Sequence, residues 1–382
     1  MKRGTTAVYL AGFLQGAAFV LIPALGPILH SAPYNLSNAA YGMLYFPEII
    51  GAILAALAAG SIHARTGGSG LFRLGALCNG GAMALLIAAY FSHGLPVVLL
   101  LLAETLMLGI GFGLTNTAIN RAASLLFAGR AAGAVTLLNA LIGGATAVSP
   151  VIMEGFAHHL AWVLWPVLLL AAWLSLLALP LVADTGHEIG GLGSWRRSML
   201  PFAAAVLIYA ICEGSFASWA NVLISVNRSL PTADGALALS LFWAGMTAAR
   251  VILGAIPDAV LPRRPVLLLS PVGMAACFFA IPQFQSAPAL IALFAAAGMA
   301  CGAYYPYSMA YGIATHGEEG TQMAGLLVGA LMVGEGIGSF GLGPLQQVVP
   351  LGDIYTLSAA WALPLIWLAW GNSRAARKDT NE

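Results

Sequence analysis

The sequence predicts an all-α polytopic membrane protein with twelve transmembrane helices, arranged as two bundles of six. Its composition is the first indication, because 60% of the 382 residues are hydrophobic and only 8% are charged. A soluble domain is about 25% charged, so this chain has too few charges to cover a surface in water. The second indication is a succession of apolar segments, and the third is the placement of Lys and Arg residues in alternate loops.

Each apolar segment is long enough to cross a bilayer, which takes about 20 residues in an α-helix. The loops between these segments are short, so we expect little of the protein to lie outside the membrane. The predicted spans are 7–29, 41–62, 71–91, 96–120, 131–152, 161–183, 199–226, 236–257, 265–283, 288–314, 321–346 and 352–370.

Basic residues predict the orientation of these spans. Thirteen of the 15 Lys and Arg residues lie before the first span, in loops that follow even-numbered spans, or after the last span. Because cytoplasmic loops are enriched in Lys and Arg, both termini are expected in the cytoplasm. The exceptions are Arg228, in an opposite loop, and Arg250, inside span 8. The loop between spans 10 and 11 is the weak point, since it carries His316, Glu318 and Glu319 but no Lys or Arg.

A polar, Gly-rich segment, "DTGHEIGGLGSWRRS", divides the spans into two groups of six. Such composition is typical of a linker. The halves also resemble each other, because "AGAVTLLNALIGGATAVSP" in span 5 is similar to "AGLLVGALMVGEGIGSFGLGP" in span 11. We therefore expect an N-terminal bundle at 1–183, a cytoplasmic linker at 184–198, a C-terminal bundle at 199–370 and a cytoplasmic tail at 371–382.

Two loops resemble the motif of the major facilitator superfamily, which reads roughly G-x-x-x-D-R-x-G-R-R. "GSIHARTGG" follows span 2 and has Ala64 in place of the aspartate, while "GAIPDAVLPRR" follows span 8 and keeps Asp258. The resemblance implies the major facilitator fold, with two parallel six-helix halves. It also implies a cytoplasmic latch between the halves, to which we assign Gly60, Arg65, Gly67, Arg250, Asp258, Arg263 and Arg264.

Three further stretches resemble the fucose-permease-like branch, whose members are fucose, galactose or glucose:proton symporters. These stretches are "YAICEGSFASWANVLI", "SLFWAGMTAARVILG" and "GIGFGLTNTAIN". Members of the branch often carry carboxylates in spans 1 and 4, whereas span 1 of this chain has only Gln15 and the matching position in span 4 is Asn116. The resemblance therefore implies that a different carboxylate carries any coupled proton, and it argues against fucose itself as the substrate.

Charged residues inside the spans are the main functional candidates, because an ionised group at mid-bilayer costs about 2.5–3.5 kcal/mol on insertion scales. Glu213 and Glu335 lie near the centres of spans 7 and 11 and are the proton-coupling candidates. For each, the alternative is a structural hydrogen bond at a helix contact. Glu48 and Glu104 lie in the outer thirds of spans 2 and 4, where either a structural role or a place in an outer vestibule is open. Arg250 is expected to pair with Asp258 in the latch, with anion binding as the alternative.

Polar and aromatic side chains at helical spacing predict a solute site. Asn116 and Asn120 share one face of span 4, and three tyrosines share a face of span 10, which Pro306 loosens. Aromatic rings with scattered hydrogen-bonding groups suit sugars or amphipathic organic molecules, although packing alone also explains a single tyrosine. The substrate-binding candidates are Gln15, Asn116, Asn120, Glu213, Trp219, Asn221, Tyr304, Tyr307 and Tyr311.

The sequence shows no catalytic constellation and no metal-ligand spacing, and its four cysteines are scattered among apolar segments. We expect no enzymatic activity, no cofactor and no bound metal, and the net charge of +1 indicates no nucleic-acid partner. The expected function is secondary active transport of a small, sugar-like organic solute by alternating access, coupled to protons or another ion. The expected partners are this solute, the coupling ion and the lipid bilayer, around a monomer in a bacterial inner membrane. A proton-driven exporter of drugs or metabolites is the alternative, and a non-transporting receptor or membrane enzyme is a remote one.

Overall fold

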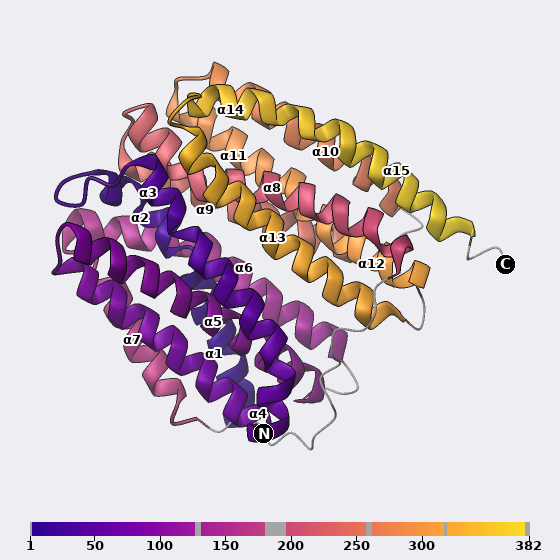
Figure 1. Ribbon diagram of the computed structural model, residues 1–382, viewed down its shortest axis with the longest axis horizontal. Helices are drawn as coiled ribbons and strands as arrows, with labels where there is room; N and C mark the ends of the chain where they lie inside the picture. The colour runs from indigo at the N-terminus through magenta and orange to yellow at the C-terminus, as the bar shows by residue number, and fades with distance from the viewer. Residues whose placement is uncertain (1, 127–130, 180–195, 257–261, 317–318, 379–382) are drawn as a thin grey trace. The chain divides into compact units, whose positions relative to one another are not determined.

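The computed structural model describes residues 2–126, 131–179, 196–256, 262–316 and 319–378 (Figure 1). Over these residues the regular structure is helical throughout, without a β-strand. The chain forms two compact units, Met1–Gly191 and Leu192–Glu382, which we call unit 1 and unit 2. The expected linker lies mostly outside the described residues, which resume at Arg196.

Unit 1 contains seven α-helices among its described residues. They are α1 (Lys2–Phe19), α2 (Leu21–His30), α3 (Asn38–Met43), α4 (Tyr45–Tyr90), α5 (Leu95–Leu126), α6 (Ala131–His159) and α7 (Leu164–Leu176).

Unit 2 contains eight α-helices in its described part, together with short 3₁₀ and π segments. The α-helices are α8 (Leu200–Val222), α9 (Thr232–Ala255), α10 (Arg263–Ala280), α11 (Ala287–Gly302), α12 (Tyr304–His316), α13 (Gly320–Leu345), α14 (Leu351–Ser358) and α15 (Ala362–Lys378). The short segments are η2 (Arg197–Met199), η3 (Leu223–Asn227), η4 (Ile281–Gln283) and η6 (Ala359–Trp361).

These helices account for twelve membrane crossings. Ten helical segments of the described chain are long and apolar enough to span a bilayer, and Leu164–Leu176 is a shorter apolar helix. One of the ten, Asn38–Tyr90, has 53 residues, more than twice the length that one crossing needs, and its backbone leaves the helical region at Gly67. Counting that segment twice gives twelve, so the predicted fold class is confirmed.

The helix breaks differ in detail from the prediction. We expected a loop between spans 2 and 3, but the helix continues across it and is interrupted only at Gly67, whose φ is 68°. A glycine adopts this left-handed conformation without the clash that a Cβ atom would cause. Conversely, spans 1 and 10 are each divided into two helices, at Val20 and Ala303. Helix α15 also continues to Lys378, into the expected tail.

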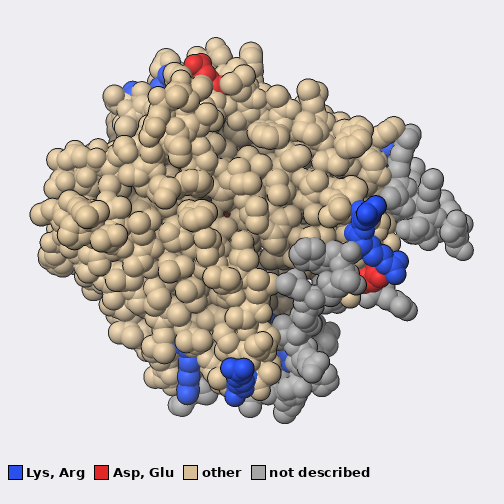
Figure 2. All heavy atoms as spheres, in the orientation of Figure 1, with Lys and Arg blue, Asp and Glu red and all other residues tan. Residues whose placement is uncertain are grey.

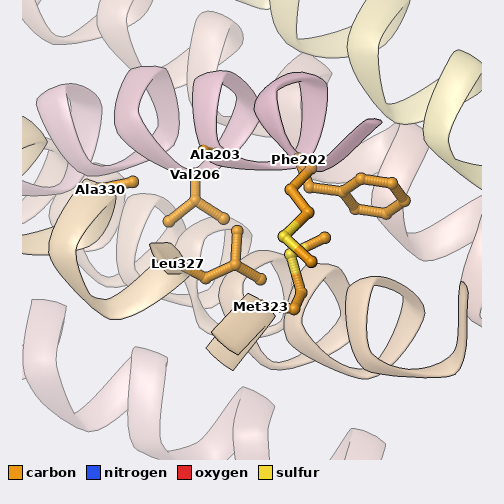
Figure 3. Close-up of a cluster of buried hydrophobic side chains, with 7 residues drawn as sticks. Phe202, Ala203, Val206, Met323, Leu327 and Ala330 are labelled. Carbon is orange, nitrogen blue, oxygen red and sulfur yellow. The ribbon is translucent and has the colours of Figure 1, made fainter. Parts of the chain in front are cut away.

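Helices α8 and α13 form the central contact of unit 2. A Cβ atom at Gly338 would lie 2.2 Å from the carbonyl oxygen of Ile211, and one at Gly214 would lie 2.4 Å from that of Glu335. The absence of side chains at such positions lets the two backbones touch. Towards one end the same two helices close a hydrophobic cluster, shown in Figure 3, of Met199, Phe202, Ala203, Val206, Met323, Leu327 and Ala330.

The segments that precede α8 and α13 lie at the same end of unit 2. Arg196 Nε is 2.7 Å from Glu319 Oε1, and the Ser198 hydroxyl is 3.1 Å from Nε2 of His316. The loop between spans 10 and 11 therefore shares its side of the membrane with the basic residues before span 7. This contact removes the one ambiguity that the charge pattern left in the topology of unit 2.

The surface suits a lipid environment. In Figure 2 most of the visible face is neither acidic nor basic, and charged side chains are few. Large apolar side chains such as Leu54, Leu99 and Trp367 are exposed, over a far larger surface than a soluble monomer tolerates. The chain is an integral membrane protein.

Candidate functional site

Glu213 lies on α8 and is buried, with 5% of its surface exposed. Its Oε1 is 3.9 Å from Nη2 of Arg250 on α9. Its other oxygen, Oε2, has no hydrogen-bond partner among the described residues. A buried carboxylate requires a counter-charge or a proton. Here the counter-charge is present, and one oxygen remains open to a proton or to a solute hydroxyl.

The position of Arg250 depends on the break between α11 and α12. Proline has no backbone N–H, so Pro306 cannot donate to the carbonyl of Gly302, four residues before it. That carbonyl oxygen instead accepts a hydrogen bond from Arg250 Nε, at 3.2 Å. The proline therefore has two effects, since it divides span 10 and supplies the acceptor that holds the guanidinium beside Glu213.

Two stacked tyrosines complete the buried side of this site. The rings of Tyr209 and Tyr304 lie 5.1 Å apart with an interplanar angle of 17°, and both residues are fully buried. Tyr209 precedes Glu213 by one helical turn, and its hydroxyl interacts electrostatically with both Glu213 and Arg250. Over the described chain this hydroxyl makes no hydrogen bond of normal geometry, and Glu213 and Arg250 are its charged neighbours.

Tyr305 is a member of the site that the sequence analysis missed. It is half-buried and interacts electrostatically with both Arg250 and Glu213. The predicted stripe placed Tyr304, Tyr307 and Tyr311 on one face of a loosened helix and left Tyr305 out, whereas span 10 divides before Tyr304, where α12 begins. The signal available in the sequence was the tyrosine pair directly before Pro306. We call the five residues Tyr209, Glu213, Arg250, Tyr304 and Tyr305 the Glu213 cluster.

The other tyrosine candidates of span 10 make different contacts. The Tyr307 hydroxyl donates to the carbonyl of Leu253 on α9, at 3.3 Å. Tyr311 packs against the hydrophobic cluster of Figure 3. The structure therefore separates the predicted stripe, since Tyr304 alone of the three stacks on Tyr209.

Trp219, Asn221 and Glu335 lie at helix contacts. The indole of Trp219 is fully buried and donates to the Ser339 carbonyl of α13, at 2.9 Å. The side-chain oxygen of Asn221 accepts from the Ser225 hydroxyl, at 3.2 Å. Glu335 is half-buried on α13, where its backbone carbonyl faces Gly214. These placements match the close helix packing that the small residues around Glu335 indicated.

The predicted latch is described only in part. Its residues Gly60, Arg65 and Gly67 belong to α4, and Arg65 is exposed. Asp258, the expected partner of Arg250, lies outside the described residues, and the latch stays a prediction. The structure shows Arg250 in contact with Glu213, so this arginine belongs to the Glu213 cluster.

In unit 1, Gln15 belongs to a fully buried hydrogen-bond network. Its side-chain oxygen accepts from Asn79 Nδ2 on α4 at 2.9 Å, and the same nitrogen lies 3.1 Å from the Thr115 hydroxyl on α5. All three residues are 0% exposed. The network joins α1, α4 and α5, so Gln15 has a clear structural role.

Asn116 and Asn120 are neighbours on α5, as their spacing predicted. Nδ2 of Asn120 donates to the side-chain oxygen of Asn116 at 2.8 Å, and Asn139 of α6 donates to Asn120 at 3.5 Å. Asn116 and Asn120 are half-buried, and Asn139 is exposed. These three residues, which we call the asparagine ladder, offer adjacent amide donors and acceptors, and Asn139 was missed because it lies on another helix.

The described residues contain no group of three or more His, Cys, Asp or Glu side chains that could hold a metal ion. All four cysteines are buried with free thiols.

Comparison with solved structures identifies the fold. The nucleoside transporter NupG aligns over 96% of this chain and 99% of its own, with a TM-score of 0.78 and 13% identity. The inward-open xylose transporter XylE from E. coli aligns over 96% and 95%, with a TM-score of 0.71 and 15% identity. The chain has the major facilitator fold.

The E. coli fucose:proton symporter FucP has the same fold, with a TM-score of 0.63, 15% identity and coverage of 96% of this chain and 98% of its own. The branch that the sequence resembled is thus among the structural neighbours, and these neighbours are transporters rather than enzymes. The sequence matches no protein-family model, and no curated protein matches it.

Proposed function

We propose that the protein is a secondary active transporter that moves a small polar organic solute by alternating access, in symport with protons. The observation that carries the proposal is Glu213. This membrane-embedded carboxylate has Arg250 at 3.9 Å and an unpartnered second oxygen. In a transporter fold such a group is a default functional candidate, because it can exist with or without its proton.

The chemistry of coupling follows from this arrangement. Ionised Glu213 is balanced by Arg250, whereas protonated Glu213 leaves the guanidinium free to bind another acceptor. A solute hydroxyl near Arg250 and the Tyr209 hydroxyl would take that place. Protonation of Glu213 removes the acceptor of the Arg250 guanidinium, and the solute hydroxyl replaces that acceptor. Proton binding and solute binding therefore favour one another. Glu335 is the second proton-coupling candidate, and it lies on the helix that packs against α8.

We favour a sugar-like solute. The similar transporters are named for xylose, fucose and nucleosides, which all carry a polyhydroxylated ring. The Glu213 cluster supplies aromatic faces and hydroxyl groups, and the asparagine ladder supplies amides, a combination that suits such rings. We further propose that the protein acts as a monomer in a bacterial inner membrane with both termini in the cytoplasm, as the distribution of Lys and Arg indicates.

Uptake into proteoliposomes tests this proposal. Purified protein is reconstituted and given labelled xylose, fucose or uridine, with a proton gradient imposed in either direction. We expect at least one solute to accumulate against its own gradient when protons flow inward, and a protonophore to abolish the accumulation.

Two other outcomes are informative. Solute-driven proton movement in the opposite sense supports the alternative of a proton-driven exporter. The absence of any solute-dependent proton movement across the panel contradicts the transport proposal.

A further inference from the structure

Glu104 is a second buried carboxylate, and it lies in unit 1. It is on α5, inside one of the membrane-spanning segments, and its exposed fraction is 0%. Neither of its carboxylate oxygens has a hydrogen-bond partner among the described residues. This is a more extreme environment than that of Glu213, which keeps one oxygen near an arginine.

The nearest charged neighbour of Glu104 is another acid. Glu48 lies on α4, which contacts α5 so closely that a Cβ atom at Gly109 would be 1.9 Å from the Glu48 carbonyl oxygen. Glu48 is half-buried, and its carboxylate interacts electrostatically with Glu104. Among the described residues neither carboxylate forms an ion pair with a Lys or Arg.

Other titratable groups on the helices packed against α5 do not supply a counter-charge. On the same part of α4 the remaining group is Tyr45, whose hydroxyl donates to Tyr41 at 2.7 Å. Helix α6 contributes Glu154, which would add negative charge. On α1 the residues towards α2 carry no ionisable side chain, and Gln15 is the polar one.

An ionised Glu104 would therefore be a buried anion without a cation, without a hydrogen bond and with a second carboxylate nearby. Each of these conditions disfavours the charged form, because burial removes water and like charges repel. The neutral acid avoids both costs.

We propose that Glu104 is a proton-binding site of unit 1, occupied at neutral pH, beside a second carboxylate, Glu48, and without a cation to balance an ionised form. The site is separate from the one proposed for solute coupling at Glu213. Its existence does not depend on what the protein transports, or on whether it transports at all.

Infrared spectroscopy of the purified protein tests the site directly, because a protonated carboxylic acid has its own carbonyl stretch. The spectra are compared at neutral pH in an E213Q background, so that Glu213 contributes nothing. We expect E104Q to remove one protonated-acid band. E154Q, a change to a partly exposed glutamate of the same unit, is the matched control and should leave that band in place.

A second variant keeps the test valid if E104Q folds poorly. E48Q preserves Glu104 and removes the neighbouring carboxylate, so a protonated-acid band should persist at neutral pH in the E213Q/E48Q protein. An E104Q spectrum with an unchanged protonated-acid region would overturn the proposal. So would an E213Q/E48Q protein without a protonated-acid band at neutral pH.

Discussion

The two buried glutamates of this protein, Glu213 in unit 2 and Glu104 in unit 1, solve the same problem in different ways. Both lie on membrane-spanning helices and both are almost inaccessible. Glu213 has a guanidinium at 3.9 Å, whereas the charged neighbour of Glu104 is another carboxylate. The surroundings of Glu213 balance an ionised carboxylate, whereas those of Glu104 favour a carboxylic acid that keeps its proton.

The difference shows that burial alone does not define a proton site. The surroundings decide whether a buried carboxylate alternates between two states or stays in one. Glu213 can take both states, because Arg250 balances the anion and the unpartnered Oε2 can carry the proton. Glu104 has surroundings suited only to the neutral acid. A proton-coupled transport cycle needs a site like Glu213, which gains and loses a proton. A site like Glu104, which keeps its proton, is compatible with a stable helical bundle.

Removing the cation from Glu213 should convert its site into one like that of Glu104, with the largest effect on stability. R250M removes the cation beside Glu213, and because the Arg250 side chain is 41% exposed, we expect the loss to stay below the roughly 3–5 kcal/mol that breaking a fully buried pair costs. The cost should be greatest at high pH, where Glu213 must stay ionised, and small at acid pH, where it accepts a proton. Unfolding of the purified protein across pH measures this loss.

The control for that experiment is R228M, because the Arg228 guanidinium donates to the carbonyl of Pro282 and not to an acid. The double variant R250M/E213Q should recover most of the lost stability, whereas R228M/E213Q should show no such recovery. Equal recovery in both pairs would mean that Arg250 and Glu213 are not energetically coupled.

The scaffold that holds Glu213 should be sensitive to a single methyl group. G338A places a Cβ atom 2.2 Å from the Ile211 carbonyl oxygen, so α13 must move away from α8 at a cost of about 1–3 kcal/mol. G329A lies on the same helix with open space at its Cβ position and should be neutral or slightly stabilising. Thermal unfolding of the two variants checks this, and equal melting temperatures would contradict the close contact of the helices.

Restoring the backbone N–H at position 306 should weaken the hold on Arg250. In P306A the new N–H competes for the Gly302 carbonyl, which Arg250 otherwise uses, and a hydrogen bond contributes about 0.5–1.5 kcal/mol. The coupling energy between Arg250 and Glu213, from a double-mutant cycle, should fall by about this amount. P288A, a change in the first turn of α11 where no helical acceptor is released, should leave the coupling energy unaltered.

Supplying a cation to Glu104 should make it resemble Glu213, with the smallest effect on stability. E48K places an ammonium group where a carboxylate now lies, so Glu104 should ionise and its protonated-acid band should vanish at neutral pH. The new ion pair with Glu104 offsets the cost of placing a lysine on a membrane-spanning helix, so we expect a small net change in the free energy of unfolding. Persistence of the band in E48K would show that the two side chains are too far apart to interact.

Much of the fold was predictable from the sequence, because the bilayer imposes simple requirements on a chain. Hydropathy predicted the twelve crossings that the helices account for, whereas the orientation that Lys and Arg indicate stays a prediction. The mid-span position of Glu213 marked it as exceptional before any geometry was known, and the spacing of Asn116 and Asn120 predicted their contact. These features depend on single helices or on local composition.

The contacts between helices were not predictable in the same way. Arg250 was expected beside Asp258, a neighbour in sequence, and its contact with Glu213 on another helix depends on how α8 and α9 pack. The role of Tyr305 depends on the exact place where span 10 breaks. The isolation of Glu104 is a property of every side chain around it, and one sequence without an alignment does not reveal such surroundings.

Transport by E213Q tests the central claim most directly. Proteoliposomes that contain this variant are assayed for proton-driven accumulation and, separately, for counterflow exchange of the same solute without a gradient, with D353N as a control at an exposed carboxylate. We expect E213Q to lose proton-driven accumulation and to retain counterflow, while D353N retains both. Proton-driven uptake by E213Q at the rate of the parent protein would contradict the assignment of Glu213 as the coupling site.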